Sequence, residues 1–382
     1  MPAMEDRPYD LVLLGATGFT GRLVAEHLGR RLAGSDVRWA VAGRSPERVA
    51  EVAASVPGAP AAEVVDVGDL VGLLGLAQRT RVLGTTVGPY LRHGELVVQA
   101  CVRAGTHYAD ITGESPFVRL IGERYAADAQ QRGVQLVSCC GFDSVPPDLG
   151  AQMVAERLPQ EASLAVRAYL RANARFSGGT FASGLGLQGS DAEPLPVVPL
   201  GAQRPVQTLG ARPHRVEELG GWALPLPTID PAIVLRSAAH LEGYGRDFRY
   251  GHYAAVRSLP RAVGSAAGAG AALGLSRARP GRALLSRLAP DPGEGPSPER
   301  RARSSFSLTL LGRGGGQRVI GRVAGGDPGY DATAVMLGEA LLSLALDPRG
   351  DVAGQLTPAA ALGAPYRARL EDQGLAFSVE AA

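Results

Sequence analysis

Three glycines, each three residues after the last, follow the first apolar segment of the chain, in the sequence GATGFTG at residues 15–21. Glycines in a strand–turn–helix context suit a pyrophosphate: Gly15 permits a tight turn, Gly18 lets the backbone approach the anion, and Gly21 lets the helix pack closely. The helix N-terminus adds N–H groups and a positive dipole end. The segment is therefore predicted to bind the phosphates of a dinucleotide. Further contacts are expected from Thr17, Phe19 and Thr20.

The end of the second apolar segment indicates which dinucleotide binds. Sites that prefer NAD place an Asp or Glu there, to bind the ribose 2′-hydroxyl. Here Arg44 and Ser45 occupy that place, with Arg48 one turn further on. Because a guanidinium can pair with a 2′-phosphate and stack on adenine, the sequence favours NADP(H). The alternative is that Arg44 is only a solvated arginine at a helix start, in a site that accepts either nucleotide. Asp66, which closes the third apolar segment, is expected either to reach the adenine or to cap the next helix.

Two later segments are predicted to hold the nicotinamide end of the cofactor. Ligands of open α/β sheets bind at the carboxyl ends of the strands, and both segments directly follow predicted strands. The backbone after the sixth strand could seat the carboxamide. The expected contacts are Thr86, Gly88, Pro89 and Tyr90 after the fourth strand, and Gly141 and Phe142 after the sixth.

Hydride transfer often needs one proton donor, and three residues near these segments are candidates. The Tyr90 and Tyr108 hydroxyls could protonate the reduced substrate, although both residues could instead only shape the pocket while water supplies the proton. Asp143 is a third candidate, and it could equally cap the helix that begins near residue 147. Asp110 and Glu114 are interpreted as structural.

Other kinds of chemistry are excluded or unsupported. All 39 Lys+Arg residues are arginine, so a Schiff-base lysine, a phosphate-binding P-loop lysine and a Tyr-x-x-x-Lys relay are absent. The formal net charge is only +2 and the arginines are dispersed, so no nucleic-acid partner is expected. No metal is expected, because the histidines lack ligand spacing, and the three cysteines are interpreted as reduced thiols. These histidines are His93, His214, His240 and His252.

The first 150 residues alternate short apolar runs with helical periodicity, which predicts a parallel sheet with helices on both faces. Right-handed crossovers make this an α/β, doubly wound Rossmann domain over residues 1–150. The predicted strands are 9–14, 37–42, 64–67, 81–87, 106–111 and 134–139. The predicted helices are 19–31, 46–55, 70–77, 91–104, 117–132 and 148–157.

Residues 151–325 predict a second, inserted α+β domain built on a mostly antiparallel sheet, for substrate binding or oligomerisation. Apolar residues alternate with others over 162–172, which predicts a strand. Residues 304–311 and 318–324 flank a glycine turn, which predicts a β-hairpin. A long helix over 330–346 and the tail, within residues 326–382, are expected to return to the first domain. A homodimer through the antiparallel sheet is a hypothesis from architecture alone.

One segment could touch a membrane but is too short to span it. Residues 262–276 are rich in Ala and Gly and have arginine flanks. They predict a buried helix, a loop, or a shallow interfacial contact. Because the N-terminus lacks an apolar signal region, a cytoplasmic location is expected, with peripheral membrane contact through 262–276 at most.

Taken together, the motifs resemble the saccharopine dehydrogenase-like oxidoreductases, and in particular the branch that includes the trans-acting enoyl reductases. The match covers the first domain and the long C-terminal helix. The motifs are GATGFTG (15–21), AGR (42–44), TTVGPY (85–90), AGTHYADITGE (104–114), GFDSVPPDLG (141–150) and GDPGYDATAVMLGEAL (326–341).

The resemblance implies an NADP-binding Rossmann domain, an inserted substrate domain and reduction by NADPH. In the enoyl reductases of this group, hydride goes to a C=C bond of a polyketide-type chain carried by a partner synthase. This gives the favoured hypothesis: a small-molecule or carrier-bound acyl substrate with a polyketide synthase as partner. Saccharopine reductases act on a C–N bond instead, so reduction of C=N or C=O in a small polar substrate is the alternative. A non-catalytic dinucleotide-binding protein is the third hypothesis.

Overall fold

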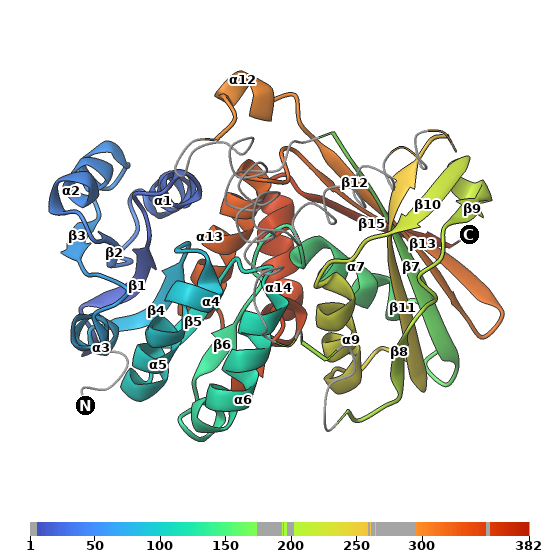
Figure 1. Ribbon diagram of the computed structural model, residues 1–382, viewed down its shortest axis with the longest axis horizontal. Helices are drawn as coiled ribbons and strands as arrows, with labels where there is room; N and C mark the ends of the chain where they lie inside the picture. The colour runs from blue at the N-terminus through green and yellow to red at the C-terminus, as the bar shows by residue number, and fades with distance from the viewer. Residues whose placement is uncertain are drawn as a thin grey trace, which may run out of the picture. The chain divides into compact units, whose positions relative to one another are not determined.

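The computed structural model describes residues 6–173, 193, 195–196, 202–258, 260, 264, 295–348 and 352–381 (Figure 1). They fold into two compact units. The first unit comprises the chain up to Phe142, Gly295 and the segment Tyr330–Gln373. The second unit comprises Asp143 to Gly329 without 293–295, together with the C-terminal residues from Gly374. The division therefore falls after Phe142, eight residues before the expected boundary at 150.

The first unit is built on a parallel sheet of seven strands, sheet A, in the order β14-β6-β5-β4-β1-β2-β3. The run 3-2-1-4-5-6 is the Rossmann order. Strand β14 extends the sheet beside β6 and was not predicted, because three residues carry too little pattern. The strands are β1 (Tyr9–Leu14), β2 (Trp39–Gly43), β3 (Ala61–Val64), β4 (Thr80–Thr85), β5 (His107–Asp110), β6 (Gln135–Val137) and β14 (Gly354–Leu356).

Helices pack on sheet A, so its central strands are buried on both faces, as their apolar runs predicted. The expected helix over 91–104 is divided at Gly94 into α4 and α5. Helix α13 packs on α1 and on β4, where a Cβ at Gly84 would lie 2.6 Å from Leu341. The helices are α1 (Phe19–Leu32), α2 (Pro46–Ser55), α3 (Leu70–Gln78), α4 (Tyr90–His93), α5 (Glu95–Ala104), α6 (Ser115–Gln131), α13 (Asp331–Leu346) and α14 (Pro358–Asp372).

The second unit is built on sheet B, with the order β15-β13-β12-β7-β11-β10-β9 and β8 beside β11. Most pairs are antiparallel, as predicted, but β11 runs parallel to β7 and to β8. The hairpin turn lies at Gly315 and Gly316, whose φ values of +56° and +78° suit glycine. The strands are β7 (Ser163–Ala172), β8 (Val206–Thr208), β9 (His214–Val216), β10 (Gly221–Pro225), β11 (Asp247–Val256), β12 (Phe306–Gly314), β13 (Gln317–Gly325) and β15 (Ala376–Ala381).

Helix α7, which was predicted across the boundary at 150, belongs to the second unit, and the expected return of the whole tail to the first domain needs correction. Helix α7 (Val145–Ala155) packs on β12 and β13 of sheet B, where a Cβ at Gly312 would lie 2.3 Å from Val154. The C-terminal strand β15 pairs with β13, so the tail joins sheet B whereas α13 and α14 belong to the first unit. Short strands beyond a helix carry no signal for which sheet they join.

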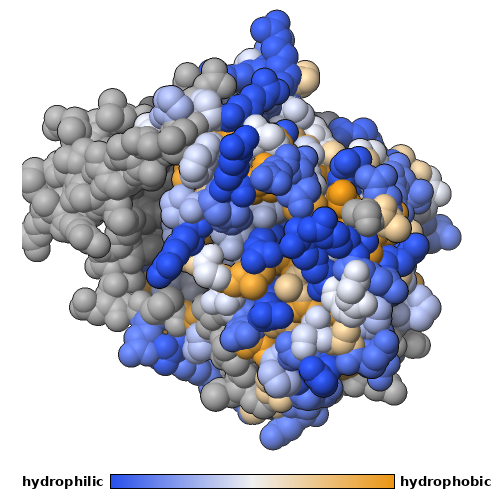
Figure 2. All heavy atoms as spheres, turned by 90° about the vertical axis from the view of Figure 1, so that its right-hand side faces the viewer, coloured by the Kyte–Doolittle hydropathy of each residue, from blue (hydrophilic) through white to orange (hydrophobic). Residues whose placement is uncertain are grey.

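Among the described residues, the α-helices that pack on sheet B lie on one of its faces. Helices α7 and α9 (Asp230–His240) pack on one side, and the short helix η2 (Glu217–Leu219) with β9 lies over part of the other. Figure 2 looks at the side without α7 and α9, where long hydrophilic side chains project around smaller apolar areas. We call this side the open face of sheet B.

The segment 262–276, selected in the sequence for a possible membrane contact, lies largely beyond the described residues, since only Gly264 of it is described. The described residues before β12 include the short helix α12 (Pro298–Arg301). Within the part of the chain that the structure describes, no helix has the length and apolar character needed to cross a membrane.

Candidate functional site

The glycine loop between β1 and α1 has a backbone that tolerates no side chain at two positions. Gly15 has a φ of +88°, and its carbonyl oxygen accepts a 3.0 Å hydrogen bond from the Gly18 N–H. A Cβ at Gly21 would lie 2.1 Å from that same oxygen. The turn therefore folds back tightly on the first turn of α1, as expected of a phosphate-binding loop.

The N-terminus of α1 is left open to an anion. Gly18 occupies the N-cap, no side chain caps the helix, and its first turn has no acidic residue. Thr17, Phe19 and Thr20 are half-buried around this end. The uncapped N–H groups and the helix dipole fit the pyrophosphate of a dinucleotide.

Thr86 ties the end of β4 to the glycine loop. Its hydroxyl donates a 3.1 Å hydrogen bond to the Gly15 carbonyl oxygen, and its N–H donates to the Leu14 carbonyl oxygen at 3.0 Å. Gly88 is exposed and Pro89 is half-buried on the same loop. The loops that follow β1 and β4 thus meet at the carboxyl end of sheet A, where the nicotinamide half was expected.

Arg44 and Arg48 are exposed beyond β2, and neither forms an ion pair with another described residue. The Ser45 hydroxyl donates to Glu47 Oε2 at 3.1 Å, and that hydrogen bond adds to one from the Glu47 backbone in lowering the pKa of Glu47. Two unpaired guanidiniums at this position fit a ribose 2′-phosphate.

Asp66 is not a helix cap. Asp69 occupies the N-cap of α3 and accepts a 3.0 Å hydrogen bond from the Val71 N–H. Asp66 is exposed and accepts from the Gly68 N–H at 2.8 Å. Of its two expected roles, only the contact with adenine remains open.

The structure places Tyr90 inside the first unit. Its hydroxyl donates to the Thr85 carbonyl oxygen at 3.0 Å, and the Ile111 N–H donates to that hydroxyl at 3.4 Å. The Glu114 carboxylate accepts hydrogen bonds from the N–H groups of Tyr90 and Leu91, each at 2.9 Å. Burial raises the pKa of Tyr90, so the phenol stays neutral. Tyr90 therefore links the ends of β4 and β5 rather than presenting its hydroxyl to solvent.

Tyr108 is fully buried in the hydrophobic core of the same unit, and burial raises its pKa as well. A hydroxyl in this position cannot meet a substrate at the surface. Because both hydroxyls are buried, neither tyrosine is placed as a proton donor in this structure. The sequence could not show this, since hydrophobic periodicity does not reveal which side chains near the end of a strand are covered.

Asp110 organises the loop that follows β6. Its carboxylate accepts hydrogen bonds from the Thr112 N–H (2.9 Å), the Cys139 N–H (3.0 Å) and the Ser138 hydroxyl (3.1 Å). Burial nevertheless raises its pKa to about 6. The carboxylate holds Cys139 at a φ of +66°, so Asp110 is structural, as interpreted from the sequence.

Gly141 and Phe142 sit against helix α13. A Cβ at Gly141 would lie 3.3 Å from both Ile111 and Thr333, and the Phe142 N–H donates to the Thr333 hydroxyl at 3.2 Å. Thr333 was not selected in the sequence analysis. Its position in the 326–341 motif was the only available signal.

Asp143 begins the second unit and is exposed to solvent. It does not cap the following helix: α7 begins at Val145, Ser144 is its N-cap, and no side chain caps it. An accessible carboxyl can exchange a proton with water and with a bound substrate, so a role as proton donor stays a prediction for Asp143.

Behind Asp143 lies a buried polar cluster that sequence reasoning missed. Asp230 accepts a hydrogen bond from the Thr228 hydroxyl, and burial, followed by the charge of Asp143, raises its pKa. His252 Nε2 lies 3.7 Å from Asp230 Oδ2, and burial lowers the pKa of His252 to about 4. The Tyr250 hydroxyl is 3.0 Å from His252 Nδ1. Burial therefore keeps these groups neutral behind Asp143.

Comparison with known proteins agrees with this geometry. Residues 11–137 match the family described as the saccharopine dehydrogenase NADP binding domain. A Mycobacterium tuberculosis protein provisionally named a trans-acting enoyl reductase is 38% identical over 97% of this chain and 97% of its own length. The trans-acting enoyl reductase of Mycobacterium ulcerans is 35% identical over 97% of this chain and 98% of its own.

A solved structure shows the same fold. Apo saccharopine dehydrogenase (L-Glu forming) from Saccharomyces cerevisiae superposes with a TM-score of 0.58 at 13% identity, covering 97% of this chain and 99% of that one. The glycine loop, the open α1 N-terminus and the family match together give NADP(H) as the cofactor. The chain belongs to the saccharopine dehydrogenase-like family, in the branch of the trans-acting enoyl reductases, and is an NADP-dependent oxidoreductase.

Proposed function

We propose that the protein reduces the C=C bond of an enoyl thioester whose acyl chain is polyketide- or lipid-like. One observation carries the choice of substrate class. The loops at the carboxyl ends of β1, β4, β5 and β6 (15–21, 86–90, 111–114 and 138–142) contain no arginine or lysine. A substrate with carboxylates, such as an amino acid, needs cations there, whereas an acyl thioester needs none. The names of the relatives point to the same reaction.

The residues of the first unit would bind and orient the cofactor. The loop from Gly15 to Gly21 would hold the pyrophosphate, Arg44 would pair with the 2′-phosphate, and Thr86 would fix the loop beside the ribose. When bound, NADPH supplies the hydride that adds to the β-carbon of the enoyl group.

Asp143 would complete the reaction as the proton donor. After hydride addition, the electron pair lies on the enolate of the thioester, and the α-carbon must gain a proton. Asp143 directly follows Phe142 in the chain and is exposed, so its carboxyl can give that proton and regain one from water. Tyr90 and Tyr108, with buried hydroxyls, are left with structural roles in this proposal.

The partner is proposed to be a synthase that delivers the acyl chain on a carrier protein. The word "trans-acting" in the names of the relatives supports a substrate that arrives on a separate protein. A homodimer through sheet B stays a prediction.

The experiment is an NADPH oxidation assay at 340 nm with 2-enoyl thioesters of pantetheine, from butenoyl to hexadecenoyl. We expect turnover that rises with chain length, with the saturated thioester identified by mass spectrometry. Turnover of a 2-oxo acid with an amine, but of no enoyl thioester, would contradict the proposal and favour reduction of a C=N or C=O bond.

A further inference from the structure

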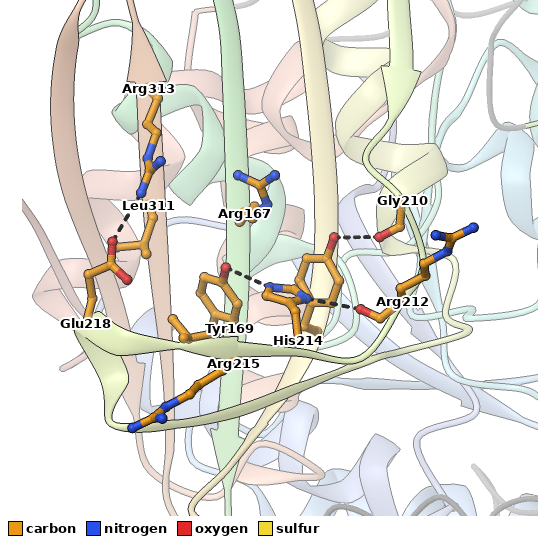
Figure 3. Close-up of a pocket in the computed structure, with 11 residues that line it drawn as sticks. Arg167, Tyr169, Gly210, Arg212, His214, Arg215, Glu218, Leu311 and Arg313 are labelled. Atoms are coloured by element: carbon orange, nitrogen blue, oxygen red, sulfur yellow. Dashed lines mark hydrogen bonds and ion pairs between the residues drawn. The ribbon is translucent and has the colours of Figure 1, made fainter.

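A cavity of about 410 Å³ opens on the open face of sheet B, formed by residues of the second unit alone (Figure 3). Its volume lies in the range of small-ligand sites. Strands β7, β11 and β12 supply its floor, and β9 with η2 supply its wall. None of its residues was selected from the sequence for cofactor binding or catalysis.

The floor of the cavity is aromatic and apolar. The rings of Tyr169 and Tyr253 stack at 5.5 Å between centroids, and the His214 ring packs edge-on against Tyr253 at 4.8 Å. Val216 and Leu311 also line the cavity. Burial raises the pKa of Tyr169 to about 12, so its phenol adds no negative charge.

The floor is rigid because polar bonds hold its rings. The Tyr169 hydroxyl lies 3.2 Å from His214 Nε2, and His214 Nδ1 lies 3.0 Å from the Arg212 carbonyl oxygen. The Tyr253 hydroxyl donates to the Gly210 carbonyl oxygen at 3.0 Å. These bonds, drawn in Figure 3, fix the segment before β9 to the sheet. A site that is ordered without a ligand loses little entropy on binding one.

The rim of the cavity is strongly cationic. Four arginines and one carboxylate, that of Glu218, line the cavity. Glu218 pairs with Arg313 at 3.1 Å, whereas Arg215 projects to the other side of β9, away from the rings of the floor (Figure 3). In the described part of the chain, the other three arginines have no carboxylate within ion-pair distance. They are Arg167, Arg212 and Arg215.

Like charges gathered at a rim repel one another unless an anion neutralises them. Guanidinium groups bind phosphate oxygens bidentately, and an excess of two positive charges, from Arg167 and Arg212, suits a doubly charged group better than a single carboxylate. The apolar floor beneath would accept a carbon skeleton.

From this arrangement we propose that the cavity binds an organic phosphate, with the phosphate on the arginine rim and the organic group on the floor of Tyr169, Tyr253, Val216 and Leu311. The ligand could be a free phosphometabolite, which is a doubly charged monoester, or the arm of a carrier, whose phosphate is a singly charged diester. The charge of the rim favours the monoester.

The test is isothermal titration calorimetry on the full chain in saturating NADPH, so that the dinucleotide site does not compete. The probes are phenyl phosphate, inorganic phosphate and benzoate. We expect phenyl phosphate to bind at least tenfold more tightly than either other probe. Equal binding of benzoate, or no binding of phenyl phosphate at 10 mM, would overturn the proposal.

Variants locate the binding. Arg167→Gln should weaken the binding of phenyl phosphate at least tenfold. Arg322→Gln is the matched control, because Arg322 is an exposed arginine of sheet B that pairs with Glu380 at 3.4 Å outside the cavity. Equal weakening in both variants would contradict the site. Methyl phenyl phosphate, a singly charged diester, stands for the carrier arm and should bind more weakly than phenyl phosphate. Equal binding of the diester would contradict the preference for a monoester.

Discussion

The Thr86 hydroxyl donates a 3.1 Å hydrogen bond to the carbonyl oxygen of Gly15, so the loop after β4 holds the phosphate loop after β1. Replacing Thr86 by Val removes the donor but keeps the shape. We expect the Kd for NADPH to rise about fivefold, the equivalent of about 1 kcal/mol for one hydrogen bond. Thr86→Ser keeps the hydroxyl and should bind as the parent does. Fluorescence titration measures both, and equal affinity in Thr86→Val would contradict the role.

Gly21 is expected to be irreplaceable because of the backbone it faces. A Cβ there would lie 2.1 Å from the Gly15 carbonyl oxygen, and backbone cannot move aside as a flexible side chain can. Gly21→Ala should lower the free energy of unfolding by about 3 kcal/mol and abolish NADPH binding. Denaturant unfolding measures the first effect and titration the second.

Gly75 provides the control. It is exposed inside α3, and a Cβ there would meet nothing within 4 Å. Gly75→Ala should raise the free energy of unfolding by about 0.5–1 kcal/mol through helix propensity. A similar loss of unfolding free energy in Gly21→Ala and Gly75→Ala would show that the close contact at Gly21 does not cause the destabilisation.

Glu339 joins α13 to α1 through a buried ionic contact. His27 Nε2 lies 2.8 Å and Arg31 Nε 2.7 Å from its Oε1. Burial alone would raise the pKa of Glu339, but these hydrogen bonds outweigh it and lower the pKa. The stabilisation is therefore present above the unfolded value, near 4.3, and is lost as the pH falls through the lower folded value.

Glu339→Gln should lower the free energy of unfolding at pH 7 by about 3 kcal/mol, because Arg31 loses its buried partner. It should also flatten the fall of Tm between about pH 5 and pH 3. Thermal unfolding across that range measures both effects. A fall of Tm below pH 5 that is as steep as in the parent chain would contradict this role of Glu339.

Asp143 should give the reaction a pH dependence of its own. Only the protonated carboxyl can donate, so kcat should fall as the pH rises through the pKa of Asp143. Asp143→Asn should lower kcat by about 10²-fold and abolish the fall of kcat with rising pH, with the Kd for NADPH unchanged. A stopped-flow pH profile with an enoyl thioester tests it. An unaltered profile would assign the proton to water.

Much of the first unit could be predicted from the sequence, and the reason is physical. Buried parallel strands need unbroken apolar runs, and a phosphate loop needs glycines, so β1, β2 and the 15–21 loop were predicted closely. Strand β14, with three residues, and the pairing of β15 with β13 depend on tertiary contacts that leave no local pattern.

The candidate site shows the same limit. Tyr90 follows the end of β4 and Tyr108 lies within β5, near the sheet edge where ligands gather, but spacing does not show that packing buries both side chains. Asp230 and His252 lie far apart in sequence and meet only through the packing of α9 on β11. Their cluster could not have been found without the fold.

Arg44 tests the cofactor assignment most directly. The substitution Arg44→Ala should raise the Kd for NADPH by about 10- to 100-fold, the value of a charge-assisted pair, and change the Kd for NADH less than twofold. Fluorescence titration with each nucleotide measures both constants. Arg103→Ala, an exposed arginine at the end of α5, is the control and should change neither. Selective loss of NADPH is the predicted result. Equal loss of both nucleotides, or no change in either, would contradict the assignment.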